Sequence, residues 1–477
     1  SMKGRAMGLF LQDTITIANR WTISAGVRFD KAYNWNPAQK RLDSPWCGQT
    51  TGLSMPEMFC GGSFQEQPVA FEFNDLTPRI GVVWDVTGDG TWALKANFSR
   101  YPEALGISYG GVTNVNDVGS EDWNWYDPNG DGIFQFGEQT TMRSSWYPGA
   151  GTEVDDELQA PLTDEYTFGL EHEVFDNILL SATGIYRGRR DDVGTINIGV
   201  PYGLMFDSDK CKAECTPVNP WGTDPWVKLQ TVDPGDDGVI GTADDGGPIP
   251  IWAVNPNTYG TNNYLTTNPN VWGFHDDTWY KGVSLVASKR WSNNWQMLAS
   301  WDIGVSEYQG SAYNPNSLWN SRRQYSSNHR DHILKLTANY LIAEPIGVNL
   351  GIFIRAQSGQ AMTASYTYDS ELLEELGPYE NQSNWGMTVV GRGEMGDKQC
   401  NGCNRPENEP FTTLVDVRAE KQFTIGKYGV VHAYFDVFNV MNANTITSFY
   451  TTINSRWMEP TYVLPPRVMR IGGAWDF

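Results

Sequence analysis

The stretch DPNGDGIFQFGE, from Asp127 to Glu138, holds the residue types and spacing that best suit chemistry in this sequence. It fits the pattern of a twelve-residue calcium loop in full, because oxygen-bearing side chains at alternate positions turn inward while the chain wraps an ion. Gly132 permits the sharp turn, and the final acid can close the shell with two oxygens. The alternative is a solvated Asp-Gly turn, which that dipeptide also favours. The expected ligands are Asp127, Asn129, Asp131, Ile133 through its carbonyl, Gln135 and Glu138.

A second acidic stretch, DPGDDGVIGTADD, repeats this spacing less completely. Gly235 stands where the first loop has an amide, and the final acid is the shorter aspartate, so weaker binding is expected unless Asp236 and Asp245 compensate. Neither stretch implies a helix pair, so both are interpreted as structural calcium clamps for acidic loops, with solvated turns as the alternative. The expected ligands of the second stretch are Asp233, Asp237, Val239 and Asp244, with Gly238 at the turn.

The six cysteines form three pairs that are close in sequence: Cys47 with Cys60, Cys211 with Cys215, and Cys400 with Cys403. All three pairs fall in predicted long connections. Local pairs on an oxidising cell surface most simply form disulfides, although six cysteines allow fifteen connectivities. A four-cysteine zinc site built from the second and third pairs is the alternative, because their spacing also suits metal ligation.

No catalytic site is predicted. Ser108 stands in a G-x-S-x-G pattern and Gly391 begins a G-x-G-x-x-G pattern. The first pattern lacks the strand and helix that a nucleophile elbow needs, and the second lacks a βαβ unit. His329 and His332 lie near a strand start, where they would point to opposite faces rather than to one metal. The sequence is therefore interpreted as that of a protein that is not an enzyme.

Composition argues against several classes of protein. The chain has 34 lysines and arginines against 56 aspartates and glutamates, and a formal charge of −22 argues against nucleic acid as a partner. It has no run of about eighteen apolar residues and no signal-peptide pattern, so no transmembrane helix is predicted and the chain is expected to be a fragment. An aromatic content of 13% with 49 glycines and few long helix-forming stretches predicts an all-β protein.

Alternation of apolar and other residues marks the elements that must position these loops. The C-terminal stretch RVMRIGGAWDF has an apolar face at every second residue up to Phe477. The same period of two, typical of β-strands with two environments, recurs at 21–30, 92–99, 295–302, 348–355 and 415–420. Alternation alone fits a soluble sandwich as well as a membrane barrel.

Connection lengths favour the membrane barrel. About thirteen strands are predicted, and the connections between them alternate in length, as in up-and-down outer-membrane barrels with short periplasmic turns. Short turns are expected at 18–19, 86–91, 175–177, 291–294, 343–346 and 425–428. Long extracellular loops are expected at about 32–75, 102–161, 190–275, 308–328, 360–410 and 442–462.

Aromatic residues agree with this orientation. Rings that are apolar but carry a polar group collect where an apolar slab meets water. Trp475 and Phe477 are therefore interpreted as closing the periplasmic rim. The residues expected at the short-turn level are Trp21, Trp92, Trp291, Trp295, Trp475 and Phe477.

Four stretches carry a resemblance to a known family: GLFLQDTITIANRWTISAGVRFD, NDLTPRIGVVWDVTGDGTWALKANFSRY, TDEYTFGLEHEV and YFDVFNVMNANT. They resemble successive strands of TonB-dependent outer-membrane receptors, especially the Oar-like group. The match covers nearly every strand and few of the loops. The aromatic end at Trp475 and Phe477 also resembles the signal that the barrel assembly machinery reads.

The resemblance implies a barrel of about 22 strands in the outer membrane of a Gram-negative-type bacterium. Residues 1–477 are then expected to be the C-terminal part of that barrel, with the plug domain, the TonB box, the signal peptide and about nine strands lying outside them. Neighbours in an up-and-down antiparallel barrel run in opposite directions, so an odd number of strands does not close one.

The polar faces of the strands then form the lumen wall. Charged residues on these faces are expected either to pair with one another or with a plug, or simply to hydrate the lumen. The expected inward-facing residues are Arg28, Asp30, Lys95, Arg187, Lys335, Arg355, Asp416, Arg418, Glu420, Arg470 and Asp476.

Tryptophans are frequent in the predicted long loops. They could stack on a sugar or another planar ligand, or they could give the loops small cores of their own. The residues concerned are Trp123, Trp125, Trp146, Trp221, Trp226, Trp252 and Trp272.

The function implied by the resemblance is uptake of an unidentified substrate, with energy supplied through TonB. The expected partners are outer-membrane lipid, the TonB complex acting on a plug, and the barrel assembly machinery, and the expected cofactor is structural calcium in the loops. The alternative is a surface-interaction or secretion-related barrel whose calcium-bound loops contact a partner. A soluble β-propeller or lectin is the third hypothesis.

Overall fold

The computed structural model describes most of the chain, with gaps in the long connections. The described residues are 2–45, 47–48, 59–106, 111, 114, 116, 120–146, 152–201, 209–210, 226–232, 235, 237, 239–254, 263–274, 278–308, 324–325, 329–360, 362, 365–368, 385–388, 409–452 and 454–477.

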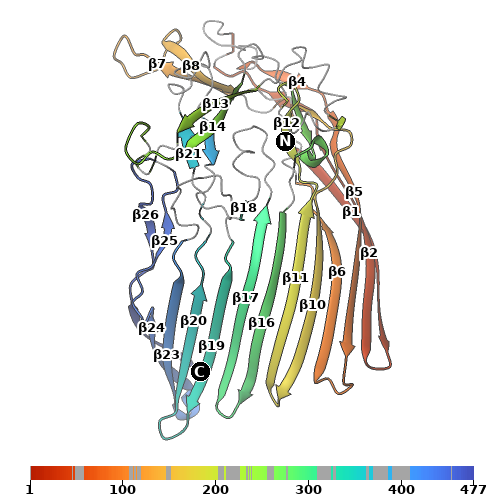
Figure 1. Ribbon diagram of the computed structural model, residues 1–477, viewed down its shortest axis with the longest axis vertical. Helices are drawn as coiled ribbons and strands as arrows, with labels where there is room; N and C mark the ends of the chain where they lie inside the picture. The colour runs from red at the N-terminus through yellow and green to blue at the C-terminus, as the bar shows by residue number, and fades with distance from the viewer. Residues whose placement is uncertain are drawn as a thin grey trace.

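The chain forms one long antiparallel wall in which each strand pairs with the next wall strand in sequence (Figure 1). The short β18 (Gln324–Tyr325) pairs with β17 beside this path. The wall strands, in spatial order, are β1 (Lys3–Ile17), β2 (Trp21–Asn36), β5 (Gln67–Asp85), β6 (Trp92–Pro102), β10 (Leu162–Phe175), β11 (Ile178–Arg190), β16 (Thr278–Ser292), β17 (Trp295–Tyr308), β19 (His332–Ile342), β20 (Val348–Gln357), β23 (Thr412–Thr424), β24 (Val430–Phe438) and β27 (Val468–Asp476). The predicted up-and-down arrangement of about thirteen strands is confirmed.

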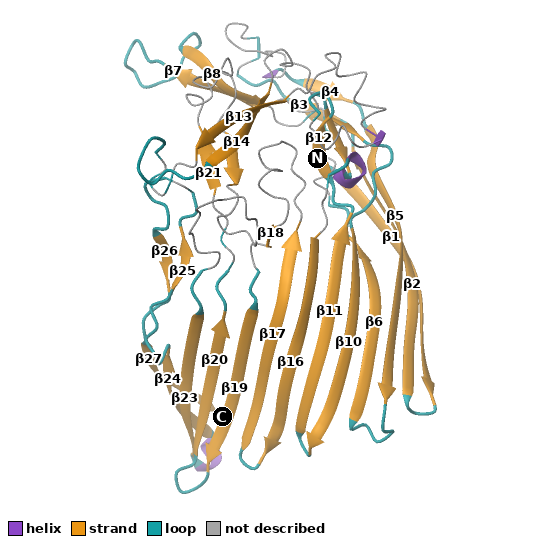
Figure 2. Cartoon of the chain, in the orientation of Figure 1, coloured by secondary structure: helices purple, strands orange, loops and turns teal. Residues whose placement is uncertain are grey.

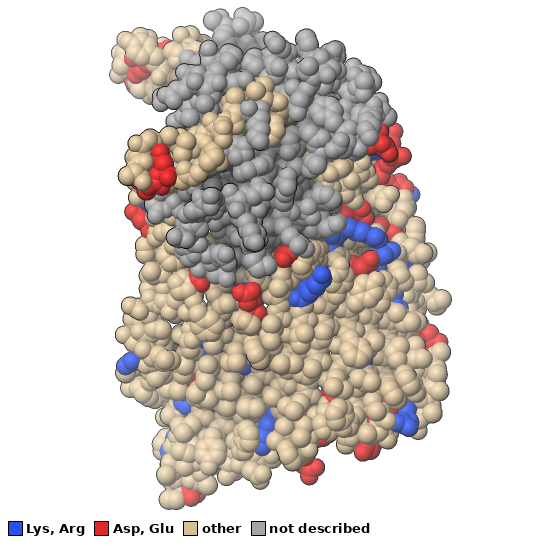
Figure 3. Space-filling model, in the orientation of Figure 1, with Lys and Arg blue, Asp and Glu red and all other residues tan. Residues whose placement is uncertain are grey.

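Strand register carries the two predicted faces across the wall. Val27 of β2 lies opposite Leu11 of β1 and Pro78 of β5, which places an apolar row on one side. The next row joins Arg28 to Phe10 and Thr77 on the other side. In Figure 3 the barrel wall is mostly uncharged, and charged side chains gather below the loops. An apolar outer band and a polar interior are the pattern of a membrane barrel.

All six short turns form where they were predicted, and they lie together at one end of the wall (Figure 2). The β1–β2 turn places Ala18 and Asn19 at φ values of 52° and 55°. The β16–β17 turn places Asn293 and Asn294 at 52° and 66°. Two consecutive positive φ values characterise the type I′ turn, whose twist matches that of the flanking strands.

The last strand ends at this same short-turn end. The indole N–H of Trp475 donates to the carbonyl of Tyr428, in the β23–β24 turn, at 2.8 Å. The ring of Trp475 lies 5.4 Å from that of Phe477. The structure therefore places both terminal aromatics where the sequence predicted them.

The long connections gather at the opposite end of the wall, where they carry short sheets of their own, here called the loop cap. One predicted boundary was wrong: β2 continues to Asn36 and β5 begins at Gln67, so their connection is shorter than 32–75. β2 and β5 stay paired beyond the predicted boundary, and there Lys31 of β2 and Glu72 of β5 form an ion pair at 2.6 Å. The cap pairs are β3 (Gln39–Arg41) with β4 (Gly62–Phe64), β7 (Ser120–Trp125) with β8 (Gln139–Trp146), β13 (Trp226–Val232) with β14 (Pro248–Val254), β21 (Ser365–Tyr368) with β22 (Trp385–Thr388), β25 (Ile446–Phe449) with β26 (Pro460–Val463), and β12 (Gly194–Asn197) with β15 (Tyr264–Thr267), which also pairs with β9 (Thr152–Val154).

Buried apolar side chains concentrate in the cap and at its junction with the wall. Among the described residues, the most deeply buried include Trp272, Phe274 and Ile196. The apolar residues of the wall, such as Phe168 and Ile471, are instead largely exposed. In the described residues no helix is long and apolar enough to span a membrane.

Candidate functional site

The inward face of the wall carries ion pairs, most of them between neighbouring strands. Lys95 lies 2.6 Å from Glu171, and Arg187 lies 2.5 Å from Glu165. Further pairing residues on this face are Arg28 with Asp30, Arg418 and Arg470 with the buried Asp436, and His432 with both Glu420 and Asp476. The prediction that lumenal charges pair with one another is confirmed for these residues.

Three predicted inward residues have other surroundings. The Arg355 guanidinium donates to the Gln357 side-chain oxygen at 2.7 Å. Asp416 accepts from the backbone N–H of Asn439 at 2.8 Å and so holds the end of β24. Lys335 lies in register with Arg355 and Ser300, on the inward face. These residues brace the wall or hydrate the lumen.

A cleft of about 550 Å³ lies at the upper end of the inward face, between β1, β2, β5 and the chain that follows β6. Arg79 lies on its wall with the guanidinium carbon 4.8 Å from the centre of the Tyr101 ring. Thr77 is buried there and donates to the carbonyl of Arg28. Cationic, aromatic and hydroxyl groups therefore meet at the mouth of the lumen, together with the carboxylates of Asp30, Asp75 and Glu103; we call this the lumenal cleft.

Asn34 adds a polar group to the lumenal cleft that the wall does not satisfy. Its side chain is 1% exposed, and its amide nitrogen donates to the carbonyl of Gly106 at 3.3 Å. Within the described part of the chain, its side-chain oxygen has no hydrogen-bond partner. A buried acceptor without a donor is costly, and an ordered water is the usual partner of such a group.

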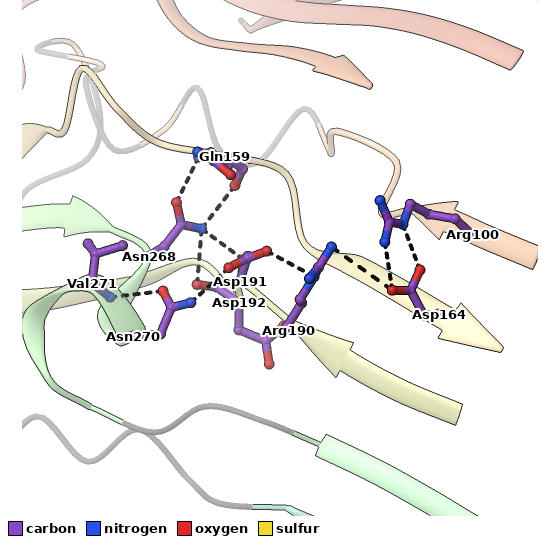
Figure 4. Close-up of polar contacts among 9 residues, drawn as sticks. All are labelled: Arg100, Gln159, Asp164, Arg190, Asp191, Asp192, Asn268, Asn270 and Val271. Carbon is purple, nitrogen blue, oxygen red and sulfur yellow. Dashed lines mark hydrogen bonds and ion pairs between the residues drawn. The ribbon is translucent and has the colours of Figure 1, made fainter. Parts of the chain in front are cut away.

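The loop cap is joined to the wall by a chain of polar contacts (Figure 4). Arg100 of β6 holds Asp164 of β10 at 2.6 Å, and Arg190 of β11 lies between Asp164 and Asp191. Asn270 donates to the Asp191 carboxylate at 2.7 Å. The buried Asn268 exchanges hydrogen bonds with the backbone of Gln159 and donates to the Asp191 carbonyl. These contacts fix the segment before Trp272 onto the wall.

Trp272 forms the centre of the cap core beside this junction. Its ring is fully buried, and its indole N–H donates to the Thr267 hydroxyl at 3.0 Å. Lys210 lies over the ring and forms a 2.7 Å ion pair with Asp155. Burial raises the pKa of Asp155 in isolation, but hydrogen bonds from Lys210 and Thr267 outweigh it and hold the pKa below its ordinary value.

For the other loop tryptophans, the two predicted roles were stacking on a ligand and forming a small loop core. Trp226 is also buried, which confirms a core role for it and for Trp272. Trp125 is 46% exposed, with its indole N–H donating to Glu138. Trp123 pairs across the β7–β8 hairpin, Trp146 ends that hairpin and Trp252 lies in β14, whereas Trp221 lies outside the described residues.

The first predicted calcium loop is a tightly hydrogen-bonded turn. Asp127 accepts from the backbone N–H groups of Gly130 and Gly132, which lower the pKa of its carboxyl, that of Gly132 most. Asn129 accepts from Asp131, and Asp131 from Ile133 and from the Gln135 side chain. Glu138 is 8% exposed, and its carboxylate accepts from Trp125 and from the Gln135 backbone.

The loop's carboxylates are turned toward its own N–H groups. Among the described residues, Asp127, Asp131 and Glu138 do not form a group of three acids whose oxygens all lie within 4.8 Å of one another. Calcium at this loop therefore remains a prediction.

In the second predicted calcium loop, the described acids converge on Thr242. Its hydroxyl lies 2.7 Å from an Asp244 carboxylate oxygen and 3.5 Å from one of Asp237, and it can also donate to the Val239 carbonyl, at 3.1 Å. Gly235 lies so close to Asp244 that a Cβ would be 2.3 Å from its carboxylate. Asp233 and Asp236 lie outside the described residues.

One of the three predicted disulfides is present in the described structure. Cys47 and Cys60 are bonded, with their Cα atoms 4.5 Å apart. Asp43 beside them accepts from the backbone of Gly61. Cys211, Cys215, Cys400 and Cys403 lie outside the described residues, as do Ser108 and Gly391.

The two histidines have separate surroundings, as predicted. The buried His329 accepts from the Ser306 backbone and bonds to Asp331. His332 lies near the ring of Trp301.

The short-turn rim is richer in rings than the sequence indicated. Trp84 stacks on Trp21 with ring centres 4.7 Å apart, and His172 stacks on Trp92 at 3.7 Å. Trp84 precedes a short turn by two residues and could have been found by the rule that located Trp21. His172 could not, because a histidine in an alternating strand is normally assigned to the polar face.

The chain belongs to the outer membrane beta barrel domain family, whose pattern it matches over residues 1–457. It is 25% identical over 228 residues to the TonB-dependent transporter Oar of Myxococcus xanthus, which covers 41% of this chain and 19% of that protein. The resemblance to the Oar group, the barrel fold and the outer-membrane location are thus confirmed. The chain spans about a fifth of that relative's length.

Two solved receptors align with all of this chain and with less than half of their own length. The ferric-catecholate import receptor Fiu of E. coli K12 aligns with all of this chain and 45% of its own, with 9% identity and a TM-score of 0.49. The ferripyoverdine receptor of Pseudomonas aeruginosa aligns with all of this chain and 39% of its own, with 12% identity and a TM-score of 0.46.

Proposed function

We propose that the chain supplies the wall and the extracellular loops of a TonB-dependent receptor that takes up a substrate across the outer membrane. The observation that carries the proposal is the lumenal cleft, where Arg79 and Tyr101 meet below the loop cap. Similarity to Oar supports a TonB-coupled role. In this proposal the energy acts through a plug domain outside residues 1–477.

The proposed role of the lumenal cleft is to hold substrate after it passes the loops. A guanidinium beside an aromatic ring can pair with an anion and stack on a planar group. Arg187 is paired with Glu165, whereas Arg79 lies over the ring of Tyr101. This predicts a substrate with a carboxylate or another planar anionic group.

The test compares depletion of compounds from a defined medium by cells with and without the protein, in the presence and absence of a protonophore. We expect at least one anionic compound whose depletion requires both the protein and the proton-motive force. Arg79→Gln should slow that depletion severalfold, while the matched lumenal variant Arg187→Gln should slow it less. If no compound depends on both, the uptake function is wrong.

We also propose that calcium binds the Asp127 loop and, more weakly, the Asp237 loop. The full set of oxygen-bearing residues at the required spacing supports the first site. Binding would turn the carboxylates of Asp127, Asp131 and Glu138 from their N–H donors toward the ion. Proteolysis of the β7–β8 region should slow in calcium, and Glu138→Gln should remove most of that protection. Equal cleavage in calcium and in chelator would contradict the proposal.

A second candidate function is contact with a partner at the cell surface. The ordered core of the loop cap around Trp272 favours it, because a packed cap presents a defined surface. If partner contact is the function, a protonophore should not change the depletion of any compound from the medium. The same depletion experiment therefore distinguishes partner contact from uptake.

A further inference from the structure

A groove of about 1050 Å³ runs along the lipid-facing side of the wall, across β6, β10, β11, β16 and β17. Register places Phe168, Gly184 and Val283 in one row on this side. Gly184 has no side chain, and a Cβ there would meet only the carbonyl of Phe168, at 3.8 Å. The row therefore has a gap between two bulky residues, and that gap forms the floor of the groove.

Lys281 lies at the upper end of the groove, in register with Tyr186 and Tyr166. Its ammonium is 4.2 Å from the centre of the Trp279 ring and 5.7 Å from that of Tyr186. Among the described residues, no carboxylate forms an ion pair with Lys281. Arg100 and Arg190, on the same side of the wall, are by contrast paired with Asp164.

The height of Lys281 places it at the outer interface. It is 292 − 281 = 11 positions above Ser292, which ends β16 at the short-turn rim. At a rise of about 3.3 Å per residue and a strand tilt of about 40°, this corresponds to about 28 Å along the membrane normal. The apolar band of such barrels is about 25 Å tall, so the ammonium emerges where lipid phosphates lie.

We propose that this groove binds one phosphate-bearing, multiply acylated lipid of the outer leaflet. The phosphate pairs with Lys281, and an acyl chain lies along the floor at Gly184, between Phe168 and Val283. Within the described part of the wall this ammonium, held among aromatic rings, has no counter-charge, and a lipid phosphate supplies one at the height where the apolar floor ends. The nearby Asp331 does not fill this role, because its carboxylate bonds to His329.

The test uses the protein purified from outer membranes, delipidated in detergent, and mixed with diphosphoryl lipid A or its dephosphorylated form as probes. Native mass spectrometry measures the fraction of protein that retains a lipid. We expect the wild type to retain one diphosphoryl lipid A. Lys281→Gln should weaken retention about fivefold, the contribution of one interfacial lysine. Gly184→Leu, which fills the floor but keeps the charge, should also weaken it.

The matched control is Lys427→Gln, because Lys427 also stacks on a tyrosine ring, 5.4 Å from its centre, but at the opposite rim. This variant should retain lipid A as the wild type does. Lys281→Arg should restore retention, which separates loss of charge from loss of fold. Equal retention of both probes by the wild type, or unchanged retention in Lys281→Gln, would overturn the proposal.

Discussion

The barrel wall and the loop cap bury their apolar side chains against different partners. In the wall, residues such as Phe168 and Ile471 are exposed by 60% and 84% and face lipid. In the cap, Trp272 and Phe274 are buried by the protein itself. The wall is one sheet thick and gains order from strand pairing, whereas the cap needs a packed core. Substitutions should therefore act by opposite rules in the two regions.

The largest effect is expected from truncation of the cap core. Trp272→Ala should cost about 3–5 kcal/mol of cap stability, because it removes a buried ring and leaves a cavity. Hydrogen exchange should rise sharply in β12 and β15 and stay unchanged in β19 and β20. Uniform exchange across both regions would show that cap and wall unfold as one unit.

Charge on the lipid face should have the next largest effect. Phe168→Arg should cost up to about 2–4 kcal/mol, the cost of Arg at the midplane, which falls toward about 0–1 kcal/mol near an interface. The matched variant Thr167→Arg, one residue away and on the inward face, should cost far less. Both are measured by denaturant unfolding in lipid vesicles, and equal costs would contradict the assigned faces.

The ion pair between Lys210 and Asp155, beside Trp272, should make the stability of the cap depend on pH. Lys210→Met should cost the cap about 1.5–3 kcal/mol, because it leaves Asp155 without its charged donor. The pKa of Asp155 is lowered in the fold, so its contribution is present above its ordinary value of 3.8 and is lost as the pH falls through the folded pKa. The pKa of Lys210 is raised despite burial, so its contribution is fully present below its ordinary value of 10.5 and is lost as the pH rises through the folded pKa.

The measurement is proteolysis of the cap as a function of pH. Protection of the wild-type cap should fall as the pH drops below 3.8 and as it rises above 10.5. Lys210→Met should remove the fall in protection at high pH. A wild-type cap whose protection stays equal however far the pH falls below 3.8 or rises above 10.5 would show that the pair contributes nothing.

The smallest change in stability is expected at the short-turn rim. Replacing Trp475 and Phe477 by Asp should cost only about 0–1 kcal/mol, since charge is tolerated near an interface. The amount of barrel inserted in cells should nevertheless fall, if the assembly machinery reads these aromatics. Normal insertion would show that they are merely the end of a strand.

The wall was predictable because a period of two fixes which residues share a face. Once Val27 is assigned to lipid, register assigns Leu11 and Pro78 without further information. Exceptions arise where a strand leaves the membrane. Arg100 and Asp164 lie on the outer side, above the apolar band, where charge is no longer costly.

The loop cap was less predictable from the sequence than the wall. Its strand β14, with sequence PIPIWAV, contains two prolines, which remove backbone donors and argue against a strand. It forms because β13 and the cap core support it. The lumenal cleft was missed because Asn34 and Tyr101 lie in separate strands, and nothing in their spacing shows that they meet.

The paired positive-φ residues of the short turns also bear on the order of assembly. The β16–β17 turn closes over two residues, whereas 87 residues separate Arg190 of β11 from Thr278 of β16. Closing the longer connection costs about 3 kcal/mol more in chain entropy. We therefore expect tight hairpins to form first and to join edge to edge afterwards. The unit of folding in this wall is then the hairpin, and a slow step lies wherever two hairpins meet across a long connection.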